Sequence, residues 1–211
     1  MANYYSDYPE LEFHLHHPLM ERIVELKERG YSDRETYDDA PVDFEDALEN
    51  YNKVLEIAGD IAANIIEPNS ESVDLEGPHL ENGRMIYASK TFENIEAMKK
   101  AGLTGVEMPR RYGGLNLPIT VFTMISEIVS AADSSFQNIW SLQSCIDTLY
   151  EFGSEEAAVC HHGVAAEELN RGNVDGAQGK CRMPVEISNL EAEPLDMLRD
   201  LAESHREQQS D

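Results

Sequence analysis

Apolar side chains recur at helical spacing along most of the chain before residue 156. The longest such pattern begins after Asp43, a residue that can cap a helix, and runs to Pro68, which is expected to end it. Its apolar positions are Phe44, Ala47, Leu48, Tyr51, Val54, Leu55, Ala58, Ile61, Ala62, Ile65 and Ile66. Because so wide a stripe is typical of burial against several helices, the sequence predicts a long core helix over residues 43–67.

Shorter segments with the same period predict further helices. The first begins at Pro18, which suits an initial helical turn, continues to about Arg29 and stops at Gly30. Its apolar face is expected to carry Leu19, Ile23 and Leu26. The remaining predicted helices span residues 89–101, the stretch from Pro118 to Ala132, and residues 134–150. Asp133 offers a capping oxygen to the last of these helices.

The predicted fold class is all-α, a helical bundle, because no segment before residue 156 alternates with the period of two expected of a strand. We expect a polar linker over residues 31–42 and an irregular connection over residues 68–89. Three parts are predicted: an N-terminal extension with one helix over residues 1–42, the helical domain over residues 43–156, and a loosely structured tail over residues 157–211 with a terminal helix at 188–209.

A loop rich in proline and glycine lies between two of the predicted helices. Pro109 fixes one φ angle and excludes helix, whereas adjacent Gly113 and Gly114 allow positive φ without steric cost. Asn116 tolerates the left-handed region better than most residues. Since Tyr112 supplies an apolar anchor, we expect a packed loop that either turns the chain sharply or lets another backbone group approach closely.

Charge separates this chain from an average soluble protein, since 41 acidic and 16 basic residues give a net charge of −25. A surface of this sign repels phosphate backbones and anionic lipids, so nucleic-acid binding and attachment to an anionic membrane are set aside. No apolar stretch reaches the roughly 20 residues of a membrane span. The N-terminus does not resemble a signal peptide, and three cysteines are too few for a disulfide framework, so a cytoplasmic location is predicted.

Two groups of residues could in principle bind a metal ion, one in the extension and one in the tail. They are His14, His16 and His17, and Cys160, His161, His162 and Cys181. Neither group has a recognised ligand spacing, so no metal site is predicted. The tail also contains Gly179-Lys180, but a phosphate-binding P-loop needs glycine where Val174 stands and a hydroxyl residue where Cys181 stands.

Three segments of the domain occur in an order that is characteristic of one enzyme family. They are Pro109-x-x-Tyr112-Gly113-Gly114-Leu115, Ser126–Ala132 and Leu149–Glu156. They resemble, respectively, the signature loop, the following helix and the closing stretch of the N-terminal helical domain in the acyl-CoA dehydrogenase family. With the long helix and Ala101-Gly102-Leu103-x-Gly105 upstream, the resemblance covers about residues 43–156.

The resemblance implies an oxidoreductase of fatty acid metabolism that dehydrogenates acyl-CoA thioesters with FAD and passes electrons to electron-transfer flavoprotein. In the family, a carboxylate base removes the α-proton while the flavin accepts a hydride. The N-terminal domain forms one wall of the acyl pocket, which the resemblance assigns here to Ile139, Trp140 and Gln143. Ordinary packing in the bundle core explains these three residues equally well, and no catalytic residue is named.

The sequence departs from the family after Glu156, where nothing resembles its β-domain or the C-terminal helical domain that carries the catalytic glutamate. Residues 1–42 resemble the extension of a longer bacterial subgroup. We therefore expect a chain that is catalytically incomplete through truncation or a frame shift and that binds FAD poorly on its own. The alternative is a non-enzymatic helical module that binds a partner or forms a homo-oligomer through exposed apolar faces.

Overall fold

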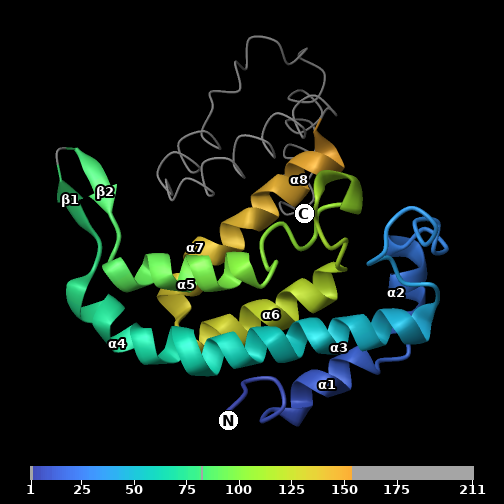
Figure 1. The fold of residues 1–211 in the computed structure, drawn as a ribbon, viewed down its shortest axis with the longest axis horizontal. Helices are drawn as coiled ribbons and strands as arrows, with labels where there is room; N and C mark the ends of the chain where they lie inside the picture. The colour runs from blue at the N-terminus through green and yellow to red at the C-terminus, as the bar shows by residue number, and fades with distance from the viewer. Residues whose placement is uncertain (1, 82, 154–211) are drawn as a thin grey trace, which may run out of the picture.

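The long apolar stripe forms helix α3 (Phe44–Ile61), which packs along helix α6 (Ile119–Ala132) in the computed structural model (Figure 1). The structure describes residues 2–81 and 83–153. The predicted cap of α3 is confirmed, because the backbone N–H of Asp46 donates to Oδ1 of Asp43 at 3.0 Å. The buried side chains of α3 include Ala47, Tyr51, Leu55, Ala58 and Ile61.

The prediction that this helix ends at Pro68 is wrong. A π-helical turn, η1 (Ala62–Ile66), follows α3, and helix α4 (Glu67–Glu76) continues the path. The backbone N–H of Glu67 bonds to the carbonyl of Ala62, five residues back, so the chain begins a new turn just before the proline. Pro68 then occupies the first turn of α4, directly after the π turn.

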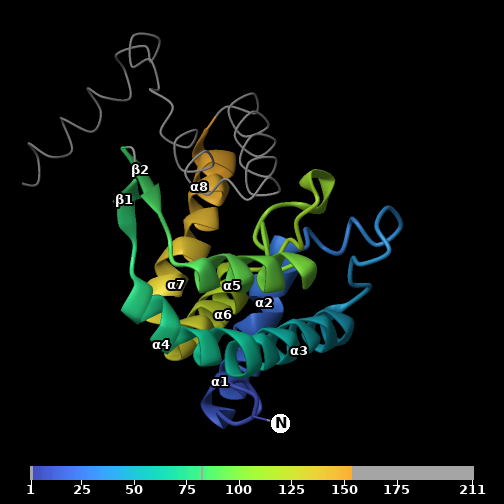
Figure 2. The same ribbon diagram turned by 60° about the vertical axis from the view of Figure 1, so that its left-hand side comes forward.

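A short antiparallel hairpin replaces part of the predicted irregular connection. Strands β1 (His79–Glu81) and β2 (Arg84–Ile86) pair with Leu80 opposite Met85. The hairpin projects away from the bundle in both views (Figures 1 and 2), and Leu80 is 73% exposed. Strands of three residues are too short to show a period of two, which explains why the sequence pattern missed them.

The other predicted helices of the domain are confirmed, with one difference. Helix α5 (Ser89–Lys100) ends before Gly102, which has φ +73°. The segment predicted as one helix over residues 134–150 is two helices, α7 (Ser134–Trp140) and α8 (Ser144–Phe152), joined by the 3₁₀ turn η3 (Ser141–Gln143). The Asp133 carboxylate accepts from the N–H groups of Ser135 and Phe136, as expected of a cap.

The N-terminal extension contains two helices rather than one, α1 (Pro9–Leu15) and α2 (Met20–Lys27). The predicted apolar face of α2 is confirmed at Ile23, which packs against the core, but is wrong at its other two residues. Leu19 and Leu26 are each 60% exposed, whereas Met20 and Val24 are buried. The helix is therefore rotated by about one residue relative to the prediction, so that Met20 and Val24 join the hydrophobic core.

The extension shares one hydrophobic core with the helices that follow it. Tyr5, Leu11 and Leu15 belong to the same cluster of buried side chains as residues of α3, α6 and α7. The N-terminal arm lies directly on α3, since the backbone N–H of Tyr4 donates to the carbonyl of Gly59 at 3.2 Å. Residues on both sides of the predicted boundary at residue 42 therefore contribute to one hydrophobic core. The predicted tail and its terminal helix lie outside the described residues.

Candidate functional site

The loop between α5 and α6 folds back on itself through backbone hydrogen bonds. After Pro109 (φ −56°), a short 3₁₀ turn, η2 (Arg110–Tyr112), ends at Gly113, which has φ +80°. Asn116 also has a positive φ, +54°, and its N–H donates to the carbonyl of Met108 at 2.9 Å. The loop is therefore ordered and packed, as its composition predicted.

Gly113 and Gly114 serve different purposes in this loop. Gly113 supplies the left-handed conformation. Gly114 has no positive φ, but a Cβ atom placed on it would overlap the carbonyl oxygen of Met108 and lie 2.5 Å from that of Gly105. Both expected uses of glycine, a sharp turn and a close backbone approach, thus occur at adjacent residues.

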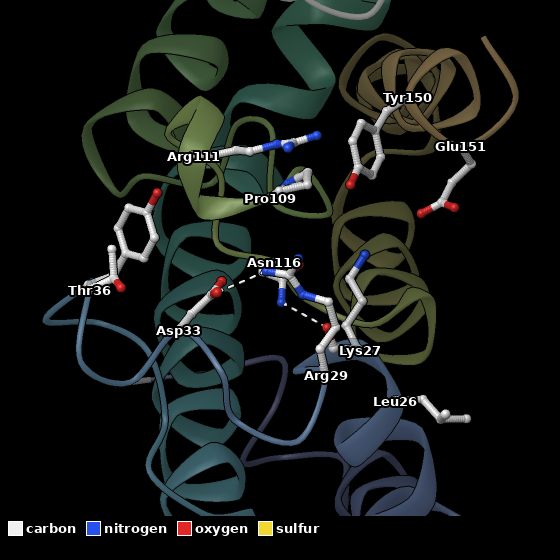
Figure 3. A pocket seen from close by; sticks show the side chains of 11 residues that line it. Leu26, Lys27, Arg29, Asp33, Thr36, Pro109, Arg111, Asn116, Tyr150 and Glu151 are labelled. Carbon is white, nitrogen blue, oxygen red and sulfur yellow. Dashed lines mark hydrogen bonds and ion pairs between the residues drawn. The ribbon is translucent and has the colours of Figure 1, made fainter. Parts of the chain in front are cut away.

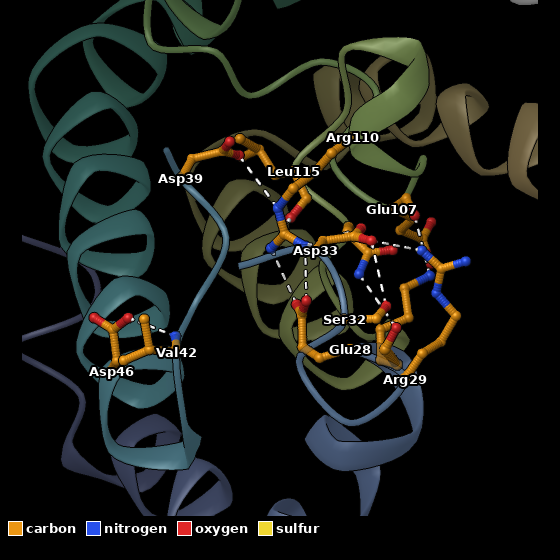
Figure 4. A network of polar contacts seen from close by, with 12 residues as sticks. Glu28, Arg29, Ser32, Asp33, Asp39, Val42, Asp46, Glu107, Arg110 and Leu115 are labelled. Atoms are coloured by element: carbon orange, nitrogen blue, oxygen red, sulfur yellow. Dashed lines mark hydrogen bonds and ion pairs between the residues drawn. The ribbon is translucent and has the colours of Figure 1, made fainter. Parts of the chain in front are cut away.

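A buried guanidinium joins this loop to the N-terminal extension (Figure 4). The Arg110 side chain is 3% exposed and donates to both carboxylate oxygens of Glu28, at 2.6 and 3.0 Å; the Glu28 side chain is 1% exposed. Asp39 and Asp33 approach the same guanidinium at 3.4 and 3.9 Å. Bidentate pairing of this kind is the strongest geometry for arginine with a carboxylate. Residues 31–42, predicted as a linker, therefore contribute carboxylates to the loop.

This buried ion pair was not predicted from the sequence. Glu28 and Arg110 are 82 residues apart, and no local pattern connects them. One weak signal was present: Glu28 follows Met20 and Val24 at four-residue intervals, on the face of α2 that is buried.

Two aromatic rings and a cation connect the loop to α8. Tyr112 and Tyr150 meet edge to face with centroids 6.0 Å apart. The Arg111 guanidinium carbon lies 4.8 Å from the centroid of Tyr112 and 5.7 Å from that of Tyr150. This geometry permits cation–π attraction. Pro109, Tyr112, Gly113 and Gly114 define the family-marker loop, the segment that resembles the family signature, and Tyr112 brings this loop into contact with the closing stretch of the domain.

Two of the predicted pocket-wall residues hold the first part of the loop. The Trp140 indole N–H donates to the carbonyl of Leu103 at 2.8 Å, and its ring stacks on Phe122 with centroids 5.3 Å apart. The side-chain oxygen of Gln143 accepts from the N–H groups of Gly105 and Val106, at 2.7 and 3.2 Å.

Ile139, the third predicted wall residue, is partly exposed at the end of α7. Trp140 and Gln143 thus act together on the loop, and the wall role of all three residues stays a prediction.

A cavity of about 390 Å³ lies between α2, the loop and α8 (Figure 3). Its lining includes Lys27, Arg111 and Tyr150, with Asp33 and Glu151 among the other contributors. The predicted wall residues do not line this cavity. The cavity is instead lined by residues of the family-marker loop, including Pro109, and by residues of the N-terminal extension.

Two carboxyl groups close to the cavity are held in an unusual electrostatic environment. Glu107 is 3% exposed, and its Oε2 atom has no hydrogen-bond partner among the described residues. Burial and the charge of Asp147 raise the pKa of Glu107 to about 7, against the opposing effect of Lys27. Burial also raises the pKa of Asp147, with Lys27 opposing and Glu151 adding to the shift. Neither carboxyl group was singled out from the sequence.

The raised pKa of Glu107 predicts that stability falls as pH rises. The folded state holds a proton that the unfolded state releases near pH 4.5, so the free energy of unfolding decreases from about pH 4.5 and levels off above about pH 7. One such group contributes at most about 1.4 kcal/mol per pH unit. Urea unfolding between pH 5 and 8 measures this slope. Glu107→Gln should reduce it, and an unchanged slope in that variant would assign the dependence to other groups.

Within the described residues, no three side chains of His, Cys, Asp or Glu come together as a metal-binding group. The cysteine and histidine residues of the tail lie outside this part of the chain. In the same part of the chain, no helix is both long and apolar enough to cross a membrane.

Comparison with known proteins accounts for this arrangement of loop and helices. Residues 49–159 match the family described as acyl-CoA dehydrogenase, N-terminal domain. A 3-methylmercaptopropionyl-CoA dehydrogenase from Ruegeria pomeroyi is 31% identical over 99 residues, which cover 43% of this chain and 17% of that protein. The chain therefore spans a minor part of the length of this curated relative. It belongs to the acyl-CoA dehydrogenase family, through the N-terminal helical domain of that family.

Proposed function

We propose that this chain provides the N-terminal domain of an acyl-CoA dehydrogenase, forming one wall of a pocket in which an acyl-CoA thioester is oxidised with FAD. The observation that carries this proposal is the family match over residues 49–159, which includes the ordered loop around Gly113 and Gly114. The similarity to a dehydrogenase that acts on a CoA thioester supports the same substrate class. Electron-transfer flavoprotein as electron acceptor, and a cytoplasmic location, are parts of the same proposal.

In this proposal the wall is built by α7 and η3. The polar atoms of Trp140 and Gln143 bond to the backbone of residues 103–106, so these two side chains fix the position of the wall. Ile139 is partly exposed beside them and presents apolar surface to the acyl chain. Hydrophobic side chains with a few fixed polar groups are the usual lining of a ligand pocket.

The described residues do not by themselves fit FAD. Carboxylates of Asp33 and Glu151 line the cavity of about 390 Å³ and would repel the negatively charged diphosphate of FAD. Glu107, whose pKa lies near neutrality, is too deeply buried to reach a substrate proton. We therefore assign the flavin site and the catalytic base to polypeptide outside the described residues, and expect this chain alone to be catalytically incomplete.

The only tryptophan of the chain provides a direct test of the wall. The purified 211-residue chain is expected to be colourless and to show no acyl-CoA-dependent dye reduction. Titration with acyl-CoA thioesters of increasing chain length should still change the fluorescence of Trp140, because the acyl chain contacts the helix that carries it. Free CoA is the matched control, since it lacks the acyl chain. A fluorescence signal that is indifferent to every thioester would rule out the wall role, and a yellow, active preparation would rule out incompleteness.

A non-enzymatic interaction module is the second candidate, and exposed apolar side chains favour it. Phe152 is 86% exposed at the end of α8, and Leu75 and Leu80 are exposed near the hairpin. A contiguous patch of such apolar side chains would be typical of a surface that binds another protein. Light scattering on the purified chain separates the candidates: self-association without a response to thioesters supports the module, whereas a monomer that responds to them supports the dehydrogenase domain.

A further inference from the structure

Two cations beside the cavity lack the carboxylate partners that six other basic residues of the described part of the chain possess. Arg22, Arg29, Lys53, Lys90, Lys99 and Arg110 each have a carboxylate oxygen within 4.0 Å. Among the described residues, neither Lys27 nor Arg111 forms such a pair, although acidic residues outnumber basic ones 41 to 16. Both unpaired cations line the same cavity.

The donors around this cavity come from three different elements. Lys27 lies at the end of α2, Arg111 in η2 and Tyr150 in α8, and Figure 3 shows the Lys27 ammonium and the Tyr150 hydroxyl directed toward the same space. Lys27 donates one hydrogen bond, to the carbonyl of Glu107 at 3.1 Å, and has two further N–H groups. The Arg111 guanidinium contacts aromatic ring faces, so its N–H edges remain available to an acceptor.

We propose that this cavity binds the oxyanion group of a small molecule, a carboxylate or a phosphate, through Lys27, Arg111 and Tyr150. Charge-assisted hydrogen bonds from lysine and arginine to an oxyanion are stronger than hydrogen bonds between neutral groups, and a tyrosine hydroxyl adds a neutral donor. A cation would meet two positive charges at the same position. The cavity is large enough for a small molecule attached to the oxyanion.

The acidic side chains near the site limit the charge that it can accept. Asp33 is paired with Arg29 at 2.8 Å, so its charge is partly neutralised. Glu151 lines the cavity without a described cationic partner and opposes an anion. Glu107 and Asp147 also act on Lys27. Burial and the charge of Asp147 raise the pKa of Glu107 to about 7, which reduces the negative charge of Glu107 near neutral pH, and burial also raises the pKa of Asp147. These groups favour a compact, singly charged oxyanion over a highly charged one.

Calorimetric titration of the full chain at pH 7 and low ionic strength tests this site. Inorganic phosphate and acetate are the two probes, and chloride at matched ionic strength is the control for general screening. We expect saturable binding of at least one probe, with a dissociation constant on the order of 1 mM. Binding of phosphate alone identifies a phosphate site, binding of acetate alone a carboxylate site, and binding of both a general oxyanion site.

Matched variants separate the site from the overall charge of the protein. Arg111→Gln and Lys27→Gln should each weaken binding about tenfold, the effect of losing one charge-assisted hydrogen bond. Lys100→Gln is the control, because Lys100 is exposed, forms no ion pair among the described residues and does not line the cavity. Absence of saturable binding, or equal losses in all three variants, would overturn the proposal. These outcomes are independent of the response to acyl-CoA thioesters, so they do not depend on the proposed function.

Discussion

Replacing Arg110 with leucine should destabilise the domain by about 3–5 kcal/mol, because the change leaves the buried Glu28 carboxylate without its partner. Asp33 and Asp39 also face the same position, at 3.9 and 3.4 Å from the guanidinium. The variant therefore gathers three carboxylates around an apolar side chain. Removing one partner of a buried pair is costly since the remaining charge cannot recover its hydration.

Urea unfolding followed by circular dichroism measures this loss. Arg22→Leu is the matched control, since it removes an arginine whose partner, Glu25, is exposed and should change stability by less than about 1 kcal/mol. The double variant Glu28→Leu/Arg110→Leu should be more stable than Arg110→Leu alone, because it removes the orphaned charge as well. If Arg110→Leu were no worse than Arg22→Leu, the ion pair would contribute nothing to stability.

Gly114→Ala should destabilise the domain by about 3 kcal/mol, at the upper end of the effects of overpacking. The added methyl group would overlap the carbonyl oxygen of Met108 and lie 2.5 Å from that of Gly105. Both atoms belong to the backbone of the same loop, so no side chain can move aside to make room. The hydrogen bond from the N–H of Asn116 to the carbonyl of Met108 would have to shift as well.

Gly113→Ala provides the comparison, because it changes the neighbouring glycine without a steric clash. Gly113 has φ +80° and no atom within 4 Å of its ideal Cβ position, so alanine there meets only the conformational penalty of about 1 kcal/mol. Thermal or urea unfolding of both variants should therefore rank Gly114→Ala as the more damaging. The opposite ranking would mean that the loop relaxes around a Cβ atom at residue 114.

The sequence could predict the elements whose signals are local. The capping residues Asp43 and Asp133 and the stop at Gly102 depend on neighbouring residues alone, and the structure confirms each of them. The prediction that the long helix ends at Pro68 was wrong because the effect of a proline on a helix depends on the turn that precedes it. The π turn at Ala62–Ile66 begins a new register, which a rule for proline in a regular helix cannot anticipate.

The candidate site could be predicted less well, since its residues come from separate segments. The buried face of α2 continues from Met20 and Val24 to Glu28, and a glutamate in that place conceals the apolar pattern. Glu28 is buried only because Arg110 is present to pair with it. Likewise, Lys27, Arg111 and Tyr150 line one cavity only after the extension, the loop and α8 have packed together. Local patterns identified the marker loop but not what surrounds it.

The separation of Glu28 from Arg110 has a consequence for the order of events during synthesis. Their 82-residue interval corresponds to roughly 4–16 s of translation at about 5–20 residues per second. Throughout that interval α1 and α2 are outside the ribosome without the loop that neutralises Glu28, and contacts so distant in sequence form slowly. The ion pair that joins the extension to the loop is therefore among the last contacts of the extension to form, and Glu28 has no Arg110 partner until then.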